Sequence, residues 1–237
     1  MKRGKIDIPT CGECDNTEGI LCNLTVQNKE VISERKGNNF YKKGQAIFYE
    51  GNHANGLFCI HDGRVKLSKL GEDGKEQIVR FAKAGDILGY RSLLSDEPYH
   101  ATATAMEDCS ICLVSKEKFN GLLETDAKLS VNVIQLLSRD LRGAEQLLID
   151  ITQKSVKERI SESLIMLKRT FGLQEDNKTL DVVLTRAEIA DMAATTTETT
   201  IRTLAQLSDE GLIELIGKKI VIKDFEGLQR IAGFSSY

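Results

Sequence analysis

The chain has 237 residues, of which 41% are apolar and 28% charged, so it is not a disordered protein and can bury the core of one large or two modest domains. Its formal net charge is −3, so any nucleic-acid site must be a local patch. No apolar run approaches the ~18 residues that span a bilayer and no apolar secretory segment follows Met1, which predicts a cytoplasmic protein without membrane contact.

Residues 1–30 form a short leader that carries half of the cysteines. Cys11, Cys14 and Cys22 lie in the leader, and Cys59, Cys109 and Cys112 lie further along the chain. In a reducing compartment thiols more often indicate a metal, redox chemistry or packing than disulfides. We expect Cys59 to be a core residue.

Residues 31–120 are rich in glycine and in short apolar alternations. Segments such as 57–60, 64–67 and 77–80 lie between glycines, and Gly71 and Gly74 flank a hairpin turn. Several short strands with closely spaced turns predict a β-sandwich or barrel.

Residues 121–154 change to a helical period. An apolar seam repeats every three or four residues at Ile134, Leu137, Leu141, Ala144, Leu148 and Ile151. This seam predicts either a helix packed on its own sandwich or a helix that also meets a partner chain.

Residues 155–237 are predicted to be mostly helical, beginning with a helix from Ser155 to Thr170. Two Thr-x-x-Glu capping boxes, at 185–188 and 195–198, begin two helices with helix-turn-helix spacing. The alternating segments 212–216 and 219–223 flank a turn that contains Gly217, which predicts a β-hairpin and therefore a winged helix.

The second of these helices has the pattern of a recognition helix. We expect Ile201, Leu204 and Leu207 on its buried side, and an N-terminal face of Thr197, Glu198, Ile201 and Arg202 directed at base edges. Arg202 can bind guanine bidentately and Glu198 can accept from cytosine. Alternatively, Glu198 only caps the helix or forms a surface pair with Arg202. Lys218 and Lys219 at the wing tip are candidate phosphate contacts, although residues 151–237 carry 12 basic and 13 acidic side chains.

These motifs resemble the CRP/FNR family of bacterial transcription regulators. The resemblance rests on segments 184–190 and 196–204 of the DNA-binding half and on 44–51, 63–66 and 85–89 of the glycine-rich half. It implies an α+β chain with a jelly-roll sensor domain over 31–120, a dimerisation helix over 121–154 and a winged-helix domain over 155–237. It also implies a homodimer on palindromic double-stranded DNA, RNA polymerase as a further partner, and DNA-binding roles for the residues Thr185, Arg186, Thr196, Thr197, Glu198, Ile201, Arg202, Lys218 and Lys219.

The family's cyclic-nucleotide pocket is altered in this sequence. Nucleotide-binding members have a glutamate where this chain has Tyr90, and an Arg-Ser pair where it has His100 and Ala101. Arg91 and Ser92 form such a pair at a different place. Because a buried phosphate needs a cation and convergent donors, cAMP is disfavoured. Tyr90, Arg91, Ser92 and His100 remain candidates for another effector.

The cysteines resemble those of the FNR-type oxygen sensors in the family. The resemblance implies a 4Fe–4S cluster on Cys11, Cys14, Cys22 and Cys112, responding to a redox, oxygen or nitric oxide signal, although the seven residues between Cys14 and Cys22 exceed the FNR-type spacing. Zinc on the two C-x2-C pairs is an alternative, but alternation on a strand would send Cys109 and Cys112 to opposite faces. The remaining alternatives to a cluster are a haem or small-molecule effector, and thiols that bind no metal.

A catalytic function is not expected. The three histidines, His53, His61 and His100, lack the close spacing of a metal-dependent jelly-roll enzyme, and no nucleophilic triad or phosphate loop is present. A thiol enzyme using Cys11 and Cys14 would leave the winged helix unexplained.

Overall fold

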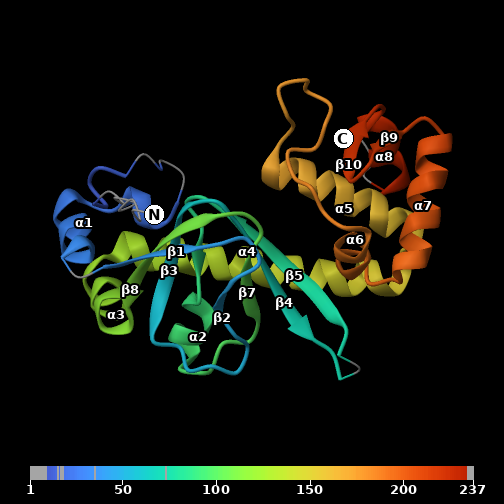
Figure 1. Ribbon diagram of the computed structural model, residues 1–237. Helices are drawn as coiled ribbons and strands as arrows, with labels where there is room; N and C mark the ends of the chain where they lie inside the picture. Colours follow the sequence, from blue (N-terminus) through green and yellow to red (C-terminus); the bar gives the residue numbers. More distant parts are fainter. Residues whose placement is uncertain (1–9, 15, 17–18, 35, 73, 234–237) are drawn as a thin grey trace. The chain divides into compact units, whose positions relative to one another are not determined.

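The computed structural model describes residues 10–14, 16, 19–34, 36–72 and 74–233. The chain divides into two compact units, residues 1–69 with 79–141 and residues 70–78 with 142–237. Strands dominate the first unit and helices the second, which confirms the expected α+β class (Figure 1). Parts of the expected leader, residues 1–9, 15 and 17–18, lie outside the described residues.

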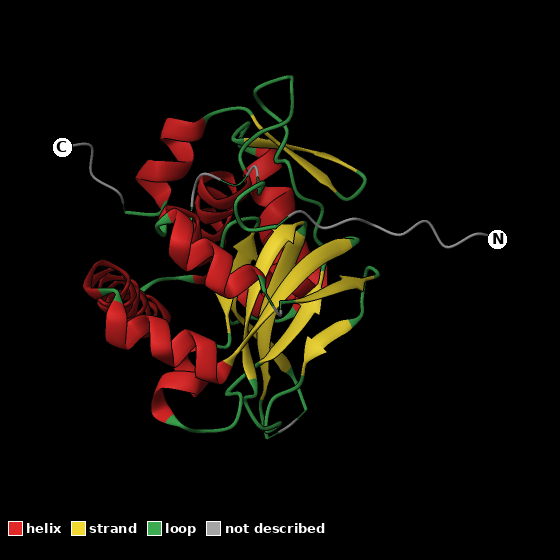
Figure 2. Cartoon of the chain, turned by 90° about the vertical axis from the view of Figure 1, so that its left-hand side faces the viewer, coloured by secondary structure: helices red, strands yellow, loops and turns green. Residues whose placement is uncertain are grey.

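Two four-stranded antiparallel sheets form the β-rich unit (Figure 2). Their strand orders are β1-β8-β3-β6 and β2-β7-β4-β5. Apart from β4 and β5, which are neighbours in one sheet, consecutive strands alternate between the sheets, as in a jelly roll, so the expected sandwich is confirmed. The strands are β1 (Gly37–Tyr41), β2 (Ala46–Phe48), β3 (Gly56–Asp62), β4 (Arg64–Leu70), β5 (Glu76–Lys83), β6 (Ile87–Leu88), β7 (Thr102–Ala105) and β8 (Cys109–Ser115).

The sandwich core comes from the alternation that the sequence shows. Leu57, Ile60, Val65 and Ile111 are fully buried. At the β3–β4 turn Gly63 has a φ of 101°, and a Cβ there would lie 2.5 Å from the Cys109 sulfur. Only glycine fits this turn, because the backbone is left-handed and the core side chain approaches it closely.

The leader is anchored on the sandwich. It contains a 3₁₀ turn (Leu21–Asn23) and the helix α1 (Val26–Ser33), which Thr25 caps. Leu21, Leu24 and Ile32 are buried in the same apolar cluster as the strands. The part of the leader around Leu21 and Leu24 is therefore packed against the sandwich.

Three helices complete the first unit or lead out of it: α2 (Tyr90–Ser95), α3 (Lys116–Thr125) and α4 (Ala127–Gln153). The helix expected over 121–154 is interrupted, because Asp126 is extended with a φ of −114° and ψ of 91°. Its carboxylate accepts from the Leu129 amide at 3.0 Å. Asp126 thus ends α3 and caps α4, so the long helix begins six residues later than expected.

The second unit is a helical domain with a hairpin. Its elements after α4 are α5 (Val156–Phe171), α6 (Arg186–Met192), α7 (Thr197–Asp209), β9 (Ile213–Ile216), β10 (Lys219–Ile222) and α8 (Phe225–Ile231). Ile160, Leu164, Ile189, Leu204 and Leu228 are fully buried. No helix in the described part of the chain is long and apolar enough to cross a membrane.

Candidate sensor and DNA-binding sites

The two helices of the helix-turn-helix begin at threonine caps. Thr185 and Glu188 form the expected capping box of α6. The second box, expected at 195–198, is wrong by one residue: Thr196 caps α7 and accepts from the Thr199 amide at 3.2 Å. Thr195 instead lies in the turn after α6, where its amide donates to the Ala190 carbonyl at 3.0 Å.

Arg159 of α5 holds the turn between these helices. Its guanidinium donates to the carbonyls of Ala193 at 2.8 Å, Ala194 at 3.3 Å and Lys154 at 2.6 Å. Ala194 has a φ of 48°, the left-handed conformation for which glycine is the usual residue. A planar, charged fork thus fixes a turn whose backbone is strained.

The face of α7 that is opposite its core is open. Thr200, Thr203, Leu204 and Leu207 point inward, whereas Thr197, Glu198 and Arg202 are exposed. We expected Ile201 both on the buried side and on the recognition face of α7. The buried placement is wrong, because the Ile201 side chain is 52% exposed. Among the described residues Glu198 and Arg202 form no ion pair, so their polar groups are available for a ligand on this face.

The wing is the expected hairpin. β9 and β10 pair antiparallel, and Lys218 and Lys219 are exposed at the tip. Arg186 of α6 is half-buried, and its Nη2 donates to the Gly217 carbonyl at 3.0 Å. Burial lowers the pKa of Arg186 from its ordinary value. Arg186 therefore ties the wing turn to the start of α6.

The seam of α4 is largely uncovered in the single chain. Ile134 is 61% exposed, Leu141 63% and Leu148 67%, with Ala144 and Ile151 also exposed, while Leu137 is partly buried against the sandwich. Exposed leucines and isoleucines in such a regular row indicate an interaction surface.

The leader brings three cysteines to the outer face of the β1-β8-β3-β6 sheet. The Cys11 amide donates to Ser33 at 3.0 Å, and the sulfur of Cys14 lies 3.4 Å from His61 Nδ1 on β3. Burial raises the pKa of Cys22, and the charges of Cys14 and Cys11 raise it further. Burial also raises the pKa of Cys112, the Lys36 charge opposes that rise, and Cys11 and Cys14 add to it. Cys11 and Cys14 therefore lie close enough to Cys22 and to Cys112 for their charges to act on both thiols.

The approach of Gly19 to the sandwich fixes this part of the leader. A Cβ at Gly19 would lie 2.4 Å from the Gly85 carbonyl oxygen and 3.1 Å from the Cys22 sulfur. The Asn16 side chain donates to the His61 carbonyl at 2.8 Å. Asn16 and Gly19, between Cys14 and Cys22, thus both lie against the sandwich.

Sequence reasoning missed three neighbours of the cysteines. Cys59, expected in the core, is only partly buried, and its Cα is the register partner of Cys112 on β8. Burial raises the pKa of Cys59, as do the charges of Cys112, Cys22, Cys11 and Cys14. His61 and Lys36, whose Nζ lies 3.6 Å from the Cys112 sulfur, complete the surroundings. Alternation along 59–61 would have put Cys59 and His61 on one face, but the pairing with β8 cannot be read from one sequence.

Cys109 belongs to a different environment. It is fully buried in the sandwich core, and its sulfur donates to the carbonyls of Arg64 at 3.4 Å and Glu107 at 3.3 Å. Burial raises its pKa. Cys109 and Cys112 thus point to opposite faces of β8, as alternation requires, and do not form one zinc knuckle.

The four effector candidates are divided between two places. Tyr90 is buried, accepts from Arg80 Nη1 at 2.6 Å and donates to the Asp140 carboxylate on α4. Arg91 also binds Asp140, at 2.8 Å. Ser92 donates to the Pro98 carbonyl at 3.0 Å, and exposed His100 pairs with Glu97 at 2.8 Å.

At the position where the sequence resemblance implies a nucleotide-binding glutamate, Tyr90 therefore forms a link inside the protein. Burial raises the pKa of Tyr90, Arg80 opposes that rise, and the hydrogen bond to Asp140 adds to it. This link joins the sandwich to the helix that carries the apolar seam.

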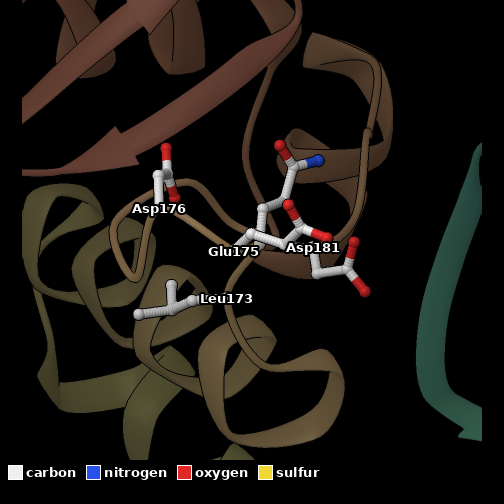
Figure 3. Close-up of a pocket in the computed structure, with 5 residues that line it drawn as sticks. Leu173, Glu175, Asp176 and Asp181 are labelled. Carbon is white, nitrogen blue, oxygen red and sulfur yellow. The ribbon is translucent and has the colours of Figure 1, made fainter.

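An open hollow in the second unit has acidic walls (Figure 3). It is lined by Leu173, Gln174, Glu175, Asp176 and Asp181, in the loop that follows α5. None of the residues expected from sequence to bind DNA, metal or effector lies there.

Comparison with known proteins agrees with this architecture. A family model for the cyclic nucleotide-binding domain matches residues 38–126, and one for the Crp-like helix-turn-helix domain matches residues 158–231. Together they cover more than half of the chain. The chain belongs to the CRP/FNR family of transcription regulators.

Members of the CRP/FNR family resemble this chain over most of its length. Electron transport regulator A of Shewanella oneidensis is 29% identical over 231 residues, covering 94% of this chain and 90% of the relative. The fumarate and nitrate reduction regulatory protein of Escherichia coli is 27% identical over 193 residues, covering 81% of this chain and 77% of the relative. The structure of FixK2 from Bradyrhizobium japonicum is 25% identical with a TM-score of 0.76, covering 85% of this chain and 100% of that chain.

Proposed function

We propose that this CRP/FNR regulator is a homodimer that senses a redox, oxygen or nitric oxide signal through a cysteine-ligated 4Fe–4S cluster. The observation that carries the proposal is the convergence of Cys11, Cys14 and Cys22 of the leader with Cys112 of β8. The names of two relatives, which concern electron transport and the reduction of fumarate and nitrate, support a redox signal.

The donor set fits such a cluster in number and chemistry. Four thiolates are what a 4Fe–4S cluster requires, and three of them come from the leader, in whose described residues the regular elements are short. Within the described residues, no group of three or more metal-ligating side chains already stands at binding distance, so the four proposed ligands would have to come closer together to hold a cluster. When bound, the cluster would supply reactivity toward oxygen or nitric oxide; the chain holds it through the leader and β8.

The functional division follows the elements. We propose residues 1–30 as the ligand-bearing leader, 31–120 as the sensor domain, 121–154 as the dimerisation segment and 155–237 as the DNA-binding domain. Ile134, Leu137, Leu141, Ala144, Leu148 and Ile151 would meet the same seam of a second copy. The occupant is a second copy because isologous two-fold contacts match palindromic DNA.

On DNA, α7 would enter the major groove and the wing would contact the backbone. Thr196, Thr197, Glu198, Ile201 and Arg202 form the proposed base-reading end of α7. Thr185 and Arg186 at the start of α6, with Lys218 and Lys219 of the wing, form the phosphate-contacting part. RNA polymerase is the partner that a regulator so bound would recruit or exclude, and we place this activity in the cytoplasm.

A second candidate keeps the scaffold but replaces the cluster by a haem or small-molecule effector in the jelly roll. The link from Tyr90 and Arg80 to Asp140 favours it, because an effector that displaced Tyr90 would act directly on α4. The altered glutamate and arginine positions disfavour cAMP in either case.

The deciding experiment is the iron, acid-labile sulfide and zinc content of the full chain purified without oxygen, with visible spectra before and after air. We expect about four iron and four sulfide per chain and a spectrum that air bleaches. Cys112→Ala should lower the iron content and Cys109→Ala should not. Zinc alone, or no metal, would contradict the cluster and direct the search to the Tyr90 region.

A further inference from the structure

Cys59 is a fifth thiol beside the four proposed ligands. The charges of all four raise its pKa, and only four thiolates are needed for the proposed cluster. Cys59 thus has no role in the function proposed above, although it lies within the same group of sulfurs.

The pairing of β3 with β8 fixes Cys59 opposite Cys112. The register is continuous from Gly56 with Ser115 to Ile60 with Ile111, and Cys59 with Cys112 lies within it. Residues directly opposite in an antiparallel pair have Cα atoms about 4.5–5.5 Å apart and side chains on one face. A disulfide needs Cα atoms about 4.4–6.8 Å apart, so the register puts this pair within the Cα range of a disulfide, and the two Cβ atoms need only a small approach.

The other cysteines of the group are held differently. Cys11, Cys14 and Cys22 are on the leader, and the sulfur of Cys14 is engaged with His61 at 3.4 Å. Cys109 points into the core on the other face of β8. Cys59 and Cys112 are therefore the one pair among the described cysteines whose two members lie on directly hydrogen-bonded strands in register.

We propose that Cys59 and Cys112 form an intrachain cross-strand disulfide when the metal-free chain meets a peroxide. One cysteine loses its proton and attacks a peroxide oxygen as the thiolate; the O–O bond breaks, and the departing hydroxide takes a proton, which gives a sulfenic acid and one water. The second sulfur then attacks the sulfenic sulfur, and the S–S bond forms as a second water leaves. Two thiols lose two electrons and two protons, and hydrogen peroxide gains them to become two waters.

The disulfide would remove Cys112 from the proposed ligand set, a consequence that rests on the proposed function. A chain oxidised in this way would not take up iron and sulfide until a dithiol reduced it. After the metal is lost, the Cys59–Cys112 disulfide would then keep the site in an oxidised form that cannot bind a cluster.

The test uses the full chain, made metal-free with a chelator without oxygen and treated with equimolar hydrogen peroxide. Remaining thiols are alkylated, and the peptides are mapped by mass without reduction. We expect one peptide that joins Cys59 to Cys112, lighter by two hydrogens than the two separate peptides, and a loss of two alkylatable thiols per chain. Dithiothreitol should restore both thiols.

The matched variants are Cys59→Ala and Cys109→Ala. Cys59 lies on β3 opposite Cys112, and Cys109 lies on the other face of β8. Cys59→Ala should abolish the linked peptide, while Cys109→Ala should leave its yield unchanged. Cys59 recovered fully alkylated, or Cys112 joined to Cys11, Cys14 or Cys22 instead, would overturn the proposal. Because the assay uses metal-free protein, its result is independent of whether the purified chain contains a cluster.

Discussion

Arg202 is the residue on which sequence-specific binding should depend most. Its side chain stands on the exposed face of α7, where a guanidinium can bind guanine bidentately. We expect Arg202→Ala to cost about 1–3 kcal/mol per half-site and to relax the preference at one base pair. Selection from randomised duplexes, followed by sequencing, measures this directly.

Lys219→Ala at the wing tip is the matched control for Arg202. A phosphate contact carries no sequence information, so this variant should weaken binding to all duplexes and lower the salt dependence by about one counterion. If Arg202→Ala behaves in the same way, with its base preference intact, Arg202 does not read a base.

Gly19 decides whether the leader can stay on the sandwich. A methyl group there would overlap the Gly85 carbonyl, and overpacking of this kind costs about 1–3 kcal/mol. We expect Gly19→Ala to open the leader and to raise the alkylation rate of Cys22 about 10- to 100-fold. Gly12→Ala, whose Cβ would have only an ordinary contact at 3.9 Å, should leave the rate unchanged. Equal rates in the two variants would contradict the close packing of Gly19.

Asp176 gives the protein a pH-dependent loop. Its carboxylate accepts from Thr179 Oγ1 at 2.5 Å and from the amides of Thr179 at 2.8 Å and Lys178 at 2.9 Å, which lowers its pKa from 3.8 to about 2. The folded-state pKa is depressed, so the stabilisation is complete above the unfolded pKa and is lost as pH falls from about 4 to about 2.

Carboxyl NMR should therefore give Asp176 a titration midpoint near pH 2. Asp176→Asn should remove the corresponding part of the pH dependence of unfolding in that window. A midpoint near 4 in the folded protein would show that the loop does not hold the charged form.

The turn of the helix-turn-helix depends on an arginine from a third helix. Arg159→Ala leaves the carbonyls of Ala193 and Ala194 without their charged donor, and hydrogen bonds to charged groups contribute about 1.5–3 kcal/mol. We expect urea unfolding to show a loss of that size. Arg159→Lys keeps the positive charge but lacks the forked donors of the guanidinium, so it should recover only part of the lost unfolding free energy. Full recovery would mean that the charge alone supports the turn.

How far the sequence predicts an element depends on whether the cause is local. The capping box at Thr185, the wing around Gly217 and the strands of the sandwich follow from neighbouring residues, and the structure confirms them. The capping residue of α7 is one position later than predicted because Thr195, after the left-handed Ala194, is bonded through its amide to the Ala190 carbonyl of α6.

Non-local pairings account for what the sequence could not predict. Cys59 meets Cys112 through a strand register with 52 residues of chain between the two cysteines, and Asp140 meets Tyr90 through the packing of α4 on the sandwich. Neither partner is visible in a hydrophobic pattern, because a pattern gives the face of an element but not its neighbour.

At the scale of the whole molecule, we expect the exposed seam of α4 to be covered by a second copy. Isologous pairing would bury Leu141 of both chains, and burying a leucine contributes about 1.5–3 kcal/mol. The Leu141→Asp substitution removes this burial energy from both chains of the dimer and places two carboxylates near the two-fold axis. We therefore expect the dimer dissociation constant to rise at least about a hundredfold. Sedimentation at micromolar concentration should show a monomer.

The control for this substitution must add the same charge to another face of the same helix. Gln135 is exposed and lies away from the seam, so Gln135→Asp should remain a dimer. If both variants dimerise like the unchanged chain, the two-fold contact is elsewhere. If both dissociate, added charge rather than the apolar seam controls assembly. The interface is assigned to the seam only if Leu141→Asp dissociates, Gln135→Asp does not, and circular dichroism shows that both variants are folded. The Leu141→Asp variant should then bind palindromic DNA far more weakly, because one linked pair of α7 helices no longer contacts the two half-sites together.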